Sequence, residues 1–404
     1  MIETKPRTMP PEMRTEQIEL SIVMPCLNEA RTLGVCIGKA AQALHDEGIA
    51  GEIIIADNGS TDGSRELAAE GGACVVDAPV RGSGAALARG IASARGRYVV
   101  MGDCDDSYDM GNIGPFIRLL REGNDLVMGN RFRGGILEGA MPWSHRYIGN
   151  PALTALGRLF FKSGCGDFYC GQRGFRRDVI LAMDLQTTGM EYALEMLVKA
   201  SMKGLRVAEV PVILSPDGRD RRPHLRTWRD GWLSLRMLLI FSPRWLFFYP
   251  SIVLMSFGLI VGAFLLAGPR EVGGIHLDIH SLVYCASAII VGFQLFSFSI
   301  FAKLLAVVTG LHPKNPRVEA LLGGRFVEAG VATGGVLVAV GLAATGLAIG
   351  RWAGNHFGDL DPFRMMRIII PAVLSLTLGL QVIFSSFYLS LLQIQCRRLR
   401  AEAQ

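Results

Sequence analysis

Residues 97–106 read RYVVMGDCDD, an apolar run of strand length that ends in a cluster of carboxylates. Four carboxylates fall within seven residues, at Asp103, Asp105, Asp106 and Asp109. Like charges this close repel one another unless a cation holds them, and a hard divalent ion bridged to diphosphate oxygens suits such a cluster. A solvated acidic loop has the same sequence pattern. On its own, the stretch therefore predicts a strand that leads into a candidate cation site.

Similar apolar runs, rich in Val and Ile, recur on both sides of this stretch. The expected strands are 20–25, 52–57, 73–76, 97–103 and 125–128, and the expected helices between them are 30–47, 62–70, 82–94 and 112–121. Strands that alternate with helices predict a parallel-sheet α/β domain covered on both faces. Ligands of such sheets bind at the carboxyl ends of the strands, where the polar clusters 25–29, 57–62 and 103–109 fall.

The second part of the chain has a different composition. Half of the 404 residues are hydrophobic, and after residue 244 apolar runs dominate. Four runs, at 245–267, 281–308, 330–350 and 368–394, are near or above the roughly 20 residues that a membrane-spanning helix requires. The sequence therefore predicts a soluble domain followed by four transmembrane helices.

The basic residues near these runs predict the orientation. Lys314, Arg317 and Arg325 lie in the second loop, and the tail is also arginine-rich, which places both termini inside. The third loop, which also holds arginines, weakens this reading. The first 18 residues show no cleavable leader, and the eight cysteines show no paired spacing, so we expect the soluble domain to stay in the reducing cytoplasm.

Two stretches before the spans have apolar stripes with basic flanks. Residues 150–163 place Leu153, Leu156 and Phe160 on one helical face, and residues 225–241 carry Trp228 and Trp232 at helical spacing. Such stripes are typical of helices that lie in a membrane surface, although a helix packed on its own domain has the same pattern. The predicted division is a polar tail (1–18), an α/β domain (19–224), an interfacial helix (225–243) and a membrane domain (244–404).

Arginines are concentrated just before the first span. Between Ser215 and Arg244 there are seven arginines and no lysine. Arginine without lysine favours bidentate recognition of phosphates, and a basic collar that faces anionic headgroups is the alternative reading.

The polar clusters resemble known signatures. Pro25-Cys26-Leu27-Asn28-Glu29 and the stretch from Asp57 to Ser64 resemble two motifs of glycosyltransferase family 2, and the spacing to Asp103 also fits. Residues 129–135 (GNRFRGG), 167–173 and 209–212 (EVPV) are similar to segments of the dolichyl- and polyprenyl-phosphate sugar transferases of that family. The resemblance covers residues 19–245, and the membrane part is similar in layout.

The resemblance implies a GT-A (Rossmann-like) domain and a set of site residues. Pro25, Asn28, Glu29, Asp57 and Asp103 are expected to bind the nucleotide, and Asp103 and Asp105 to hold Mg²⁺ or Mn²⁺. Asp105, Arg131 and Arg173 are the expected catalytic residues, and the lipid phosphate is assigned to Arg131, Arg219, Arg222 and Arg226. Glu191 and Glu195, one helical turn apart, are positioned to assist the reaction, but a role in a structural salt bridge is the favoured reading.

The implied reaction moves a sugar from UDP-glucose, a related UDP-sugar or GDP-mannose to a polyprenyl phosphate, with inversion and a divalent metal. The enzyme is expected in the inner (plasma) membrane. Its candidate partners are membrane lipid and a second copy of the chain, and no nucleic acid is expected. Asn58, where the family has a second Asp, is a departure that leaves the donor sugar open. The alternatives are a processive polysaccharide synthase and a non-enzymatic lipid-carrier binding or flipping protein.

Overall fold

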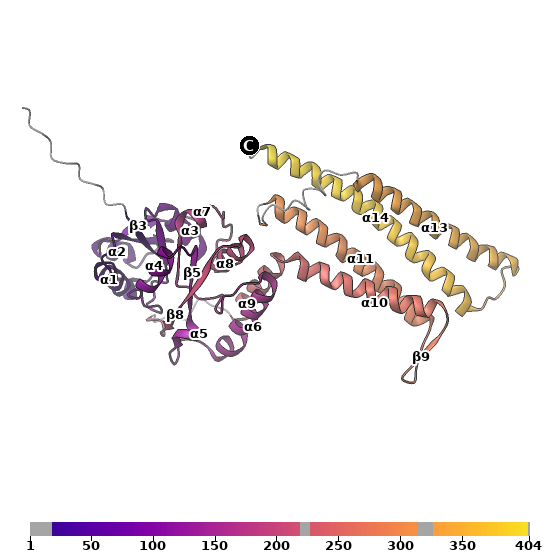
Figure 1. Cartoon of the computed structure of the whole chain (residues 1–404), viewed down its shortest axis with the longest axis horizontal. Coiled ribbons are helices and arrows are strands. Elements are labelled where there is room, and N and C mark those ends of the chain that lie inside the picture. Colours follow the sequence, from indigo (N-terminus) through magenta and orange to yellow (C-terminus); the bar gives the residue numbers. More distant parts are fainter. Residues whose placement is uncertain (1–17, 219–226, 310, 313–325, 403–404) are drawn as a thin grey trace, which may run out of the picture. The chain divides into compact units, whose positions relative to one another are not determined.

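The computed structural model describes residues 18–218, 227–309, 311–312 and 326–402 (Figure 1). The chain divides into two compact units, Met1–Leu235 and Arg236–Gln404. The division falls inside α9 (Thr227–Ile240), the helix for which the sequence predicts an interfacial position.

A sheet forms the centre of the first unit. In its described part, eight strands pair in the order β3-β2-β1-β4-β7-β5-β8-β6. They are β1 (Leu20–Cys26), β2 (Gly51–Asp57), β3 (Cys74–Asp77), β4 (Tyr98–Met101), β5 (Leu126–Asn130), β6 (Gly135–Ile136), β7 (Arg173–Arg176) and β8 (Val207–Leu214). The five strands expected from the sequence all form.

One strand departs from the predicted parallel sheet. β7 runs antiparallel to both β4 and β5, between which it lies. The chain leaves β5 at the carboxyl edge and returns from residues 131–172 at that same edge, with Arg173 opposite Met101 and Met128. Because no crossover carries the chain to the far edge before Arg173, β7 has to run in the opposite direction.

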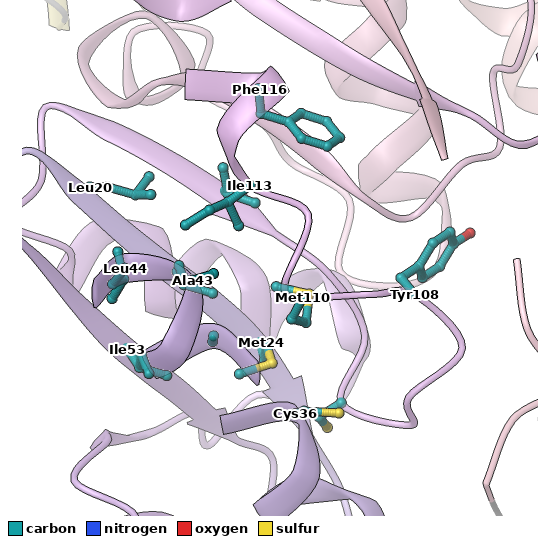
Figure 2. Close-up of a cluster of buried hydrophobic side chains, with 14 of the residues drawn as sticks. Leu20, Met24, Cys36, Ala43, Leu44, Ile53, Tyr108, Met110, Ile113 and Phe116 are labelled. Carbon is teal, nitrogen blue, oxygen red and sulfur yellow. The ribbon is translucent and has the colours of Figure 1, made fainter. Parts of the chain in front are cut away.

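Helices cover the sheet, and α1–α4 and α6 begin and end close to the expected residues. They are α1 (Ala30–Asp46), α2 (Ser64–Glu70), α3 (Ser83–Ser93), α4 (Gly114–Arg121), α5 (Arg131–Gly134), α6 (Asn150–Phe161), α7 (Arg177–Leu181) and α8 (Glu191–Lys203). α1 buries Leu33, Ile37, Ala40 and Leu44, a spacing that lines one helical face. Figure 2 shows part of the core that this face completes, with side chains from β1, β2 and the loop after β4.

The second unit is built from long apolar helices. They are η2 (Arg244–Phe248), α10 (Tyr249–Leu266), α11 (Ile279–Val308), α13 (Phe326–Gly354) and α14 (Pro362–Glu402). Among the described residues, four helical segments, starting at Arg244, Ile279, Val327 and Pro362, are long and apolar enough to cross a membrane, which confirms the four predicted spans.

Glycines let these helices pack closely in pairs. A Cβ on Gly258 of α10 would lie 2.6 Å from the carbonyl oxygen of Cys285 on α11, and one on Gly334 of α13 would lie 2.6 Å from that of Gly379 on α14. Small residues at helix contacts are how apolar helices approach one another in lipid, where the hydrophobic effect does not drive them together.

A short hairpin joins α10 and α11, where the sequence predicts only a loop. β9 (Arg270–Val272) and β10 (Ile275–Leu277) are antiparallel and are connected by Gly273 and Gly274, with φ of 58° and 79°. A two-residue turn of this kind requires positive φ at both positions, which glycine adopts without strain.

Candidate active site

Strand pairing brings the three polar clusters to one edge of the sheet. β1 lies between β2 and β4, with Cys26 opposite Asp57 and Val23 opposite Met101. The residues that follow β1, β2 and β4 therefore lie side by side at the carboxyl edge, as the sequence predicts.

The loops after β1 and β2 are tied together by side-chain hydrogen bonds. Asn28 has a φ of 59°. Its side-chain Oδ1 accepts from the backbone amide of Thr61 at 2.8 Å, and its backbone amide donates to Ser60 Oγ at 2.9 Å. The amide of the buried Glu29 donates to Ser64 Oγ at 3.0 Å. These bonds hold two of the residues expected to line the nucleotide pocket in a fixed loop.

Asp57 is itself part of this framework. Its carboxylate is 1% exposed and accepts from the amides of Gly59 (3.1 Å) and Ser60 (3.2 Å) and from Arg65 Nη1 (3.0 Å). The structure therefore places Asp57 at the expected edge, with its carboxylate shaping the turn after β2.

The local structure explains why this chain has Asn58 where the family has an aspartate. Its amide nitrogen donates to the carbonyl oxygens of Ala78 (2.8 Å) and Val80 (2.7 Å), and its Oδ1 accepts from the amide of Gly82 (2.8 Å). The side chain thus fastens the segment between β3 and α3 to the turn after β2. A carboxylate cannot donate, so an aspartate could not make the first two bonds.

The carboxylates after β4 divide into two kinds. Asp106 is paired with Lys39 Nζ at 2.7 Å, and Asp109 accepts from the amide of Gly111 at 2.9 Å. Asp105 is 6% exposed, and Ser107 orients it by donating through its amide (3.1 Å) and its hydroxyl (2.6 Å) to Oδ1. Asp106 and Asp109 therefore have partners on the surface of the loop, and Asp105 has partners within its own turn.

The remaining pair, Asp103 and Asp105, fits a divalent cation. Both side chains offer hard carboxylate oxygens and lie at the sheet edge where ligands bind. Within the part of the chain that the structure describes, no group of three or more His, Cys, Asp or Glu side chains could hold a metal ion. Two carboxylates without further protein ligands match an ion that completes its coordination with diphosphate oxygens and water.

A second network contains the segments that resemble the polyprenyl-phosphate branch. Arg131 is 7% exposed and donates through Nε (2.7 Å) and Nη2 (2.8 Å) to the fully buried carboxylate of Asp167, which also accepts from the Arg131 amide at 3.1 Å. Burial opposes the charge of Arg131, but the neighbouring Tyr108 and the bonds to Asp167 outweigh it and raise its pKa. This bidentate pair joins the loop after β5 to the segment before β7.

Glu209 of β8 brings the third matched segment into the same network. Its Oε1 accepts from the amide of Gly166 at 2.6 Å and from Asn130 Nδ2 at 3.1 Å. The segments 129–135, 167–173 and 209–212, which are far apart in the sequence, are therefore connected through carboxylates of Asp167 and Glu209.

Arg173 does not have the predicted placement. Its side chain is 0% exposed and donates to the backbone carbonyl oxygens of Cys170 (2.9 Å), Phe168 (3.0 Å) and Ala193. A guanidinium enclosed by three carbonyls has no surface to offer a substrate phosphate. We therefore replace its expected catalytic and phosphate-binding role with a structural one, which is to hold the 168–170 turn against α8.

The Arg131 network and the loop after β4 meet at Gly171. Its amide donates to the hydroxyl of the buried Tyr108 at 3.0 Å, and a Cβ at this glycine would lie 2.9 Å from Asp103 Oδ2. Tyr108 also bridges to Leu214 at the end of β8. The close approach of Gly171 to Asp103 thus puts the Arg131 network next to the candidate cation site.

Sequence reasoning missed several contributors. Lys39 and Tyr108 carry no motif signal, and only the folded chain shows what they contact. Asp167 and Glu209 stand inside matched segments, so their positions were marked although their partners were not. Arg219, Arg222 and Arg226 lie outside the described residues, and their roles stay predictions.

Comparisons with known proteins agree with this arrangement. Residues 21–182 match a model of glycosyl transferase family 2, and residues 300–393 match the glycosyltransferase family 2 C-terminal transmembrane region. The low-salt glycan biosynthesis hexosyltransferase Agl6 of Haloferax volcanii is 35% identical over 372 residues, which are 92% of this chain and 88% of that protein. A dolichyl-phosphate hexose transferase of the same organism is 30% identical over 197 residues, covering 48% of this chain and 82% of that protein.

Among solved structures, glucosyl-3-phosphoglycerate synthase from Mycobacterium tuberculosis, in complex with Mn²⁺, UDP and glucosyl-3-phosphoglycerate, is 25% identical with a TM-score of 0.43. It covers 55% of this chain, and this chain covers 77% of it. The fold and the site define a sugar-transferring enzyme whose chain continues into membrane-spanning helices. The chain belongs to glycosyltransferase family 2.

Proposed function

We propose that this enzyme transfers a hexose from a nucleotide diphosphate donor to the phosphate of a polyprenyl lipid. The observation that carries the proposal is the Arg131–Asp167–Glu209 network, in which the segments similar to polyprenyl-phosphate transferases meet beside Asp103. The similarity to a dolichyl-phosphate hexose transferase supports the same acceptor class. UDP-glucose, a related UDP-sugar and GDP-mannose are the candidate donors.

The proposed reaction does not require a strong general base. A lipid phosphate is already ionised at neutral pH, so one of its oxygens can attack the anomeric carbon directly. Catalysis then consists of positioning and of stabilising the departing diphosphate. A single in-line displacement inverts the configuration at that carbon.

Each group of residues has a part in this proposal. The loops at Asn28–Glu29 and Asp57 hold the nucleotide, and Asp103 and Asp105 hold Mg²⁺ or Mn²⁺, which when bound neutralises the developing charge of the diphosphate. Arg131 fixes the acceptor side, and a phosphate contact from it uses Nη1, since Nε and Nη2 donate to Asp167. Orientation with the catalytic unit and both termini in the cytoplasm follows from the basic loops.

The test is transfer of radiolabelled sugar from a panel of UDP- and GDP-sugars to undecaprenyl phosphate by the purified full-length chain with Mg²⁺ or Mn²⁺. Asp105→Asn removes one of the proposed metal carboxylates, and Asp106→Asn, whose residue pairs with Lys39, is the matched control. We expect a loss of about 100-fold or more for Asp105→Asn and a change of less than about threefold for Asp106→Asn.

Three outcomes decide between the candidate functions. Label in a mild-acid-labile lipid that depends on metal and on Asp105 supports the proposal and identifies the donor. Label in a polymer without labelled lipid would favour the processive synthase. Equal losses in the two variants would show that Asp105 is not distinguished from its structural neighbour.

A further inference from the structure

Two cationic side chains of the membrane unit lie near one another. Arg244 opens η2, which packs on α11 through the ring pairs Phe247–Phe298 (6.0 Å between centroids) and Phe248–Phe296 (6.4 Å). Lys303 lies on α11, five residues after Phe298, and is half-buried inside the apolar span. These ring pairs bring the start of η2, with Arg244, to the part of α11 that leads to Lys303.

His312 fixes the backbone on both sides of this pair. Its Nε2 lies 2.9 Å from the carbonyl oxygen of Phe241, and because a carbonyl only accepts, Nε2 carries the hydrogen and donates. Burial, together with Lys303 and Arg244, lowers the pKa of His312 to about 4. The ring is therefore neutral at pH 7, and it links the segment just before Arg244 to the segment after Lys303 without adding charge.

The positive charges of Lys303 and Arg244 are not balanced by a carboxylate of the described residues. Another basic residue of the same unit does have a counter-charge, because Arg367 of α14 is paired with Asp278. A half-buried lysine inside a span is costly and is normally found with a counter-charge. The structure thus holds a half-buried lysine near an exposed arginine, two positive charges that one anion with two negative charges would match.

The charge and surroundings of the pair favour one class of anion. A phosphate monoester carries about −1.5 to −2 at pH 7, which matches two cations, whereas the phosphodiester of an ordinary phospholipid carries one negative charge. Phe247, Phe248, Phe296 and Phe298 provide an apolar wall directly beside the cations. A headgroup with a phosphate monoester on an apolar chain satisfies both features.

We propose that Arg244 and Lys303 form a second phosphate site, in the membrane unit, that holds the headgroup of a polyprenyl phosphate before transfer, whereas Arg131 contacts the acceptor phosphate during transfer. The η2 and α11 aromatic rings contact the first isoprene units, and His312 keeps the two cation-bearing segments together. This inference rests on the proposed function, since it assigns the membrane unit a part in holding the acceptor. Figure 1 shows α10, which follows η2, beside α11.

The experiment uses the full-length chain in phosphatidylcholine nanodiscs that contain a small fraction of undecaprenyl phosphate. Native mass spectrometry measures how much of this lipid stays bound to the wild type and to Arg244→Gln, Lys303→Gln and the double variant. Arg351→Gln removes an exposed arginine at the end of α13 and is the matched control. Lys303→Arg keeps the charge.

We expect the double variant to retain at least about tenfold less lipid than the wild type, while Arg351→Gln and Lys303→Arg retain it. Competition by inorganic phosphate with no retention of undecaprenol supports recognition of the phosphate itself. Unchanged retention in the double variant overturns the proposal, because Lys303 then only extends toward the headgroup layer. Equal retention of phosphatidylglycerol also overturns it, since the pair then attracts any anionic lipid.

Sugar transfer, measured on the same samples, separates this inference from the proposed function. If the wild type retains undecaprenyl phosphate through Lys303 but transfers no sugar, the proposed function is contradicted and the proposed phosphate site remains supported. Normal transfer with lipid retention that does not depend on Arg244 or Lys303 would contradict the site alone.

Discussion

The backbone amide of Gly218 donates a hydrogen bond to the carbonyl oxygen of Asp105 (N···O 3.0 Å), which fastens the chain beyond β8 to the candidate metal loop. A second bond, from the amide of Ser215 to the carbonyl oxygen of Ser107 at 2.9 Å, reinforces it. Thr32 of α1 completes the junction by donating to the carbonyl oxygen of Cys104 at 2.7 Å. The candidate metal loop is thus held by the elements that flank it on both sides.

Gly218→Ala is expected to displace this junction. A Cβ at residue 218 would lie 2.6 Å from Thr32 Cγ2, closer than two carbons can approach, so one of the two segments has to move. Because a shift of about 1 Å near a reaction centre can cost about 100-fold, we expect kcat/KM for sugar transfer to fall between about 10- and 100-fold.

The double variant Gly218→Ala with Thr32→Ser tests the stated cause. Serine keeps the hydroxyl that donates to Cys104 and removes the methyl group that clashes, so activity should recover by at least about fivefold relative to Gly218→Ala. Gly34→Ala on α1, where an added Cβ meets nothing within 4 Å, should leave transfer unchanged. No recovery in the double variant would show that the clash is not the reason for the loss.

Asn58→Asp restores the residue that the family has at this position and is nevertheless expected to harm this chain. It removes the two donated bonds to Ala78 and Val80 and places a carboxylate against two carbonyl oxygens. The lost bonds to the part-buried Ala78 acceptor and the exposed Val80 acceptor cost about 1 kcal/mol or less each, so we expect a destabilisation of about 1–2 kcal/mol and a raised KM for the nucleotide sugar.

Thermal unfolding and donor titration of Asn58→Asp check this expectation. Asn124→Asp is the control, because Asn124 Nδ2 donates only one bond, to the carbonyl oxygen of Leu119 at 2.8 Å, on a helix end away from the site. A smaller loss without a change in KM is expected there. Unaltered stability and tighter donor binding in Asn58→Asp would instead mean that the segment between β3 and α3 does not depend on Asn58.

The sequence predicts local structure in this protein well because local patterns determine it. The alternation of apolar runs and helical stretches gives β1–β5 and α1–α4 within a few residues, and apolar length alone gives the four spans. The direction of β7 escapes such reasoning, because it depends on which edge of the sheet residues 131–172 return to. The hairpin at Gly273–Gly274 carries a recognisable turn signal, but its strands are only three residues long.

The candidate site divides in the same way. Residue types and spacing mark Asn28, Asp57, Asp103 and Asp105, and strand pairing brings them to one edge. Arg173 shows the limit of motif transfer: a matched arginine can serve the fold, and only its burial among three carbonyl oxygens shows this. Partners that come from distant segments, such as Glu209 for Gly166, have no local pattern that predicts them.

Asp167→Asn is expected to be among the most destabilising conservative changes in the catalytic unit. It leaves the buried Arg131 guanidinium opposite an amide that offers one oxygen in place of two. Breaking a buried ion pair from one side costs about 3–5 kcal/mol. Thermal unfolding should therefore show a large drop in Tm, with loss of transfer.

The control for Asp167→Asn is Asp178→Asn. Asp178 pairs with Arg176 at 2.7 Å, but its side chain is 66% exposed, so we expect a change of about 0.5 kcal/mol or less. Similar shifts in Tm for the two variants would show that the Arg131–Asp167 pair is not the anchor of the second network.

Because of the buried carboxylate of Glu195, we expect the free energy of unfolding to depend on pH. Its carboxylate is fully buried on α8, where it pairs with Lys199 at 2.9 Å and accepts from the amides of Gln186 and Thr187 and from the Thr187 hydroxyl. Burial opposes ionisation, but the bonds from Lys199 and Thr187 outweigh it, and the pKa of Glu195 is lowered from 4.5. These contacts support the structural role expected for Glu195.

The sign follows from that lowered pKa. The unfolded carboxyl protonates near pH 4.5 and the folded one only below it, so the stability that Glu195 contributes is complete above pH 4.5 and is lost as pH falls through the folded pKa. Glu195→Gln should therefore lie about 3 kcal/mol below the wild type at pH 7, and the gap should narrow below pH 4.5. Unfolding of the full chain between pH 3.5 and 7.5, with Glu191→Gln as the control one turn earlier, measures it. A gap that stays constant across this range would mean that the contribution of Glu195 does not depend on its charge.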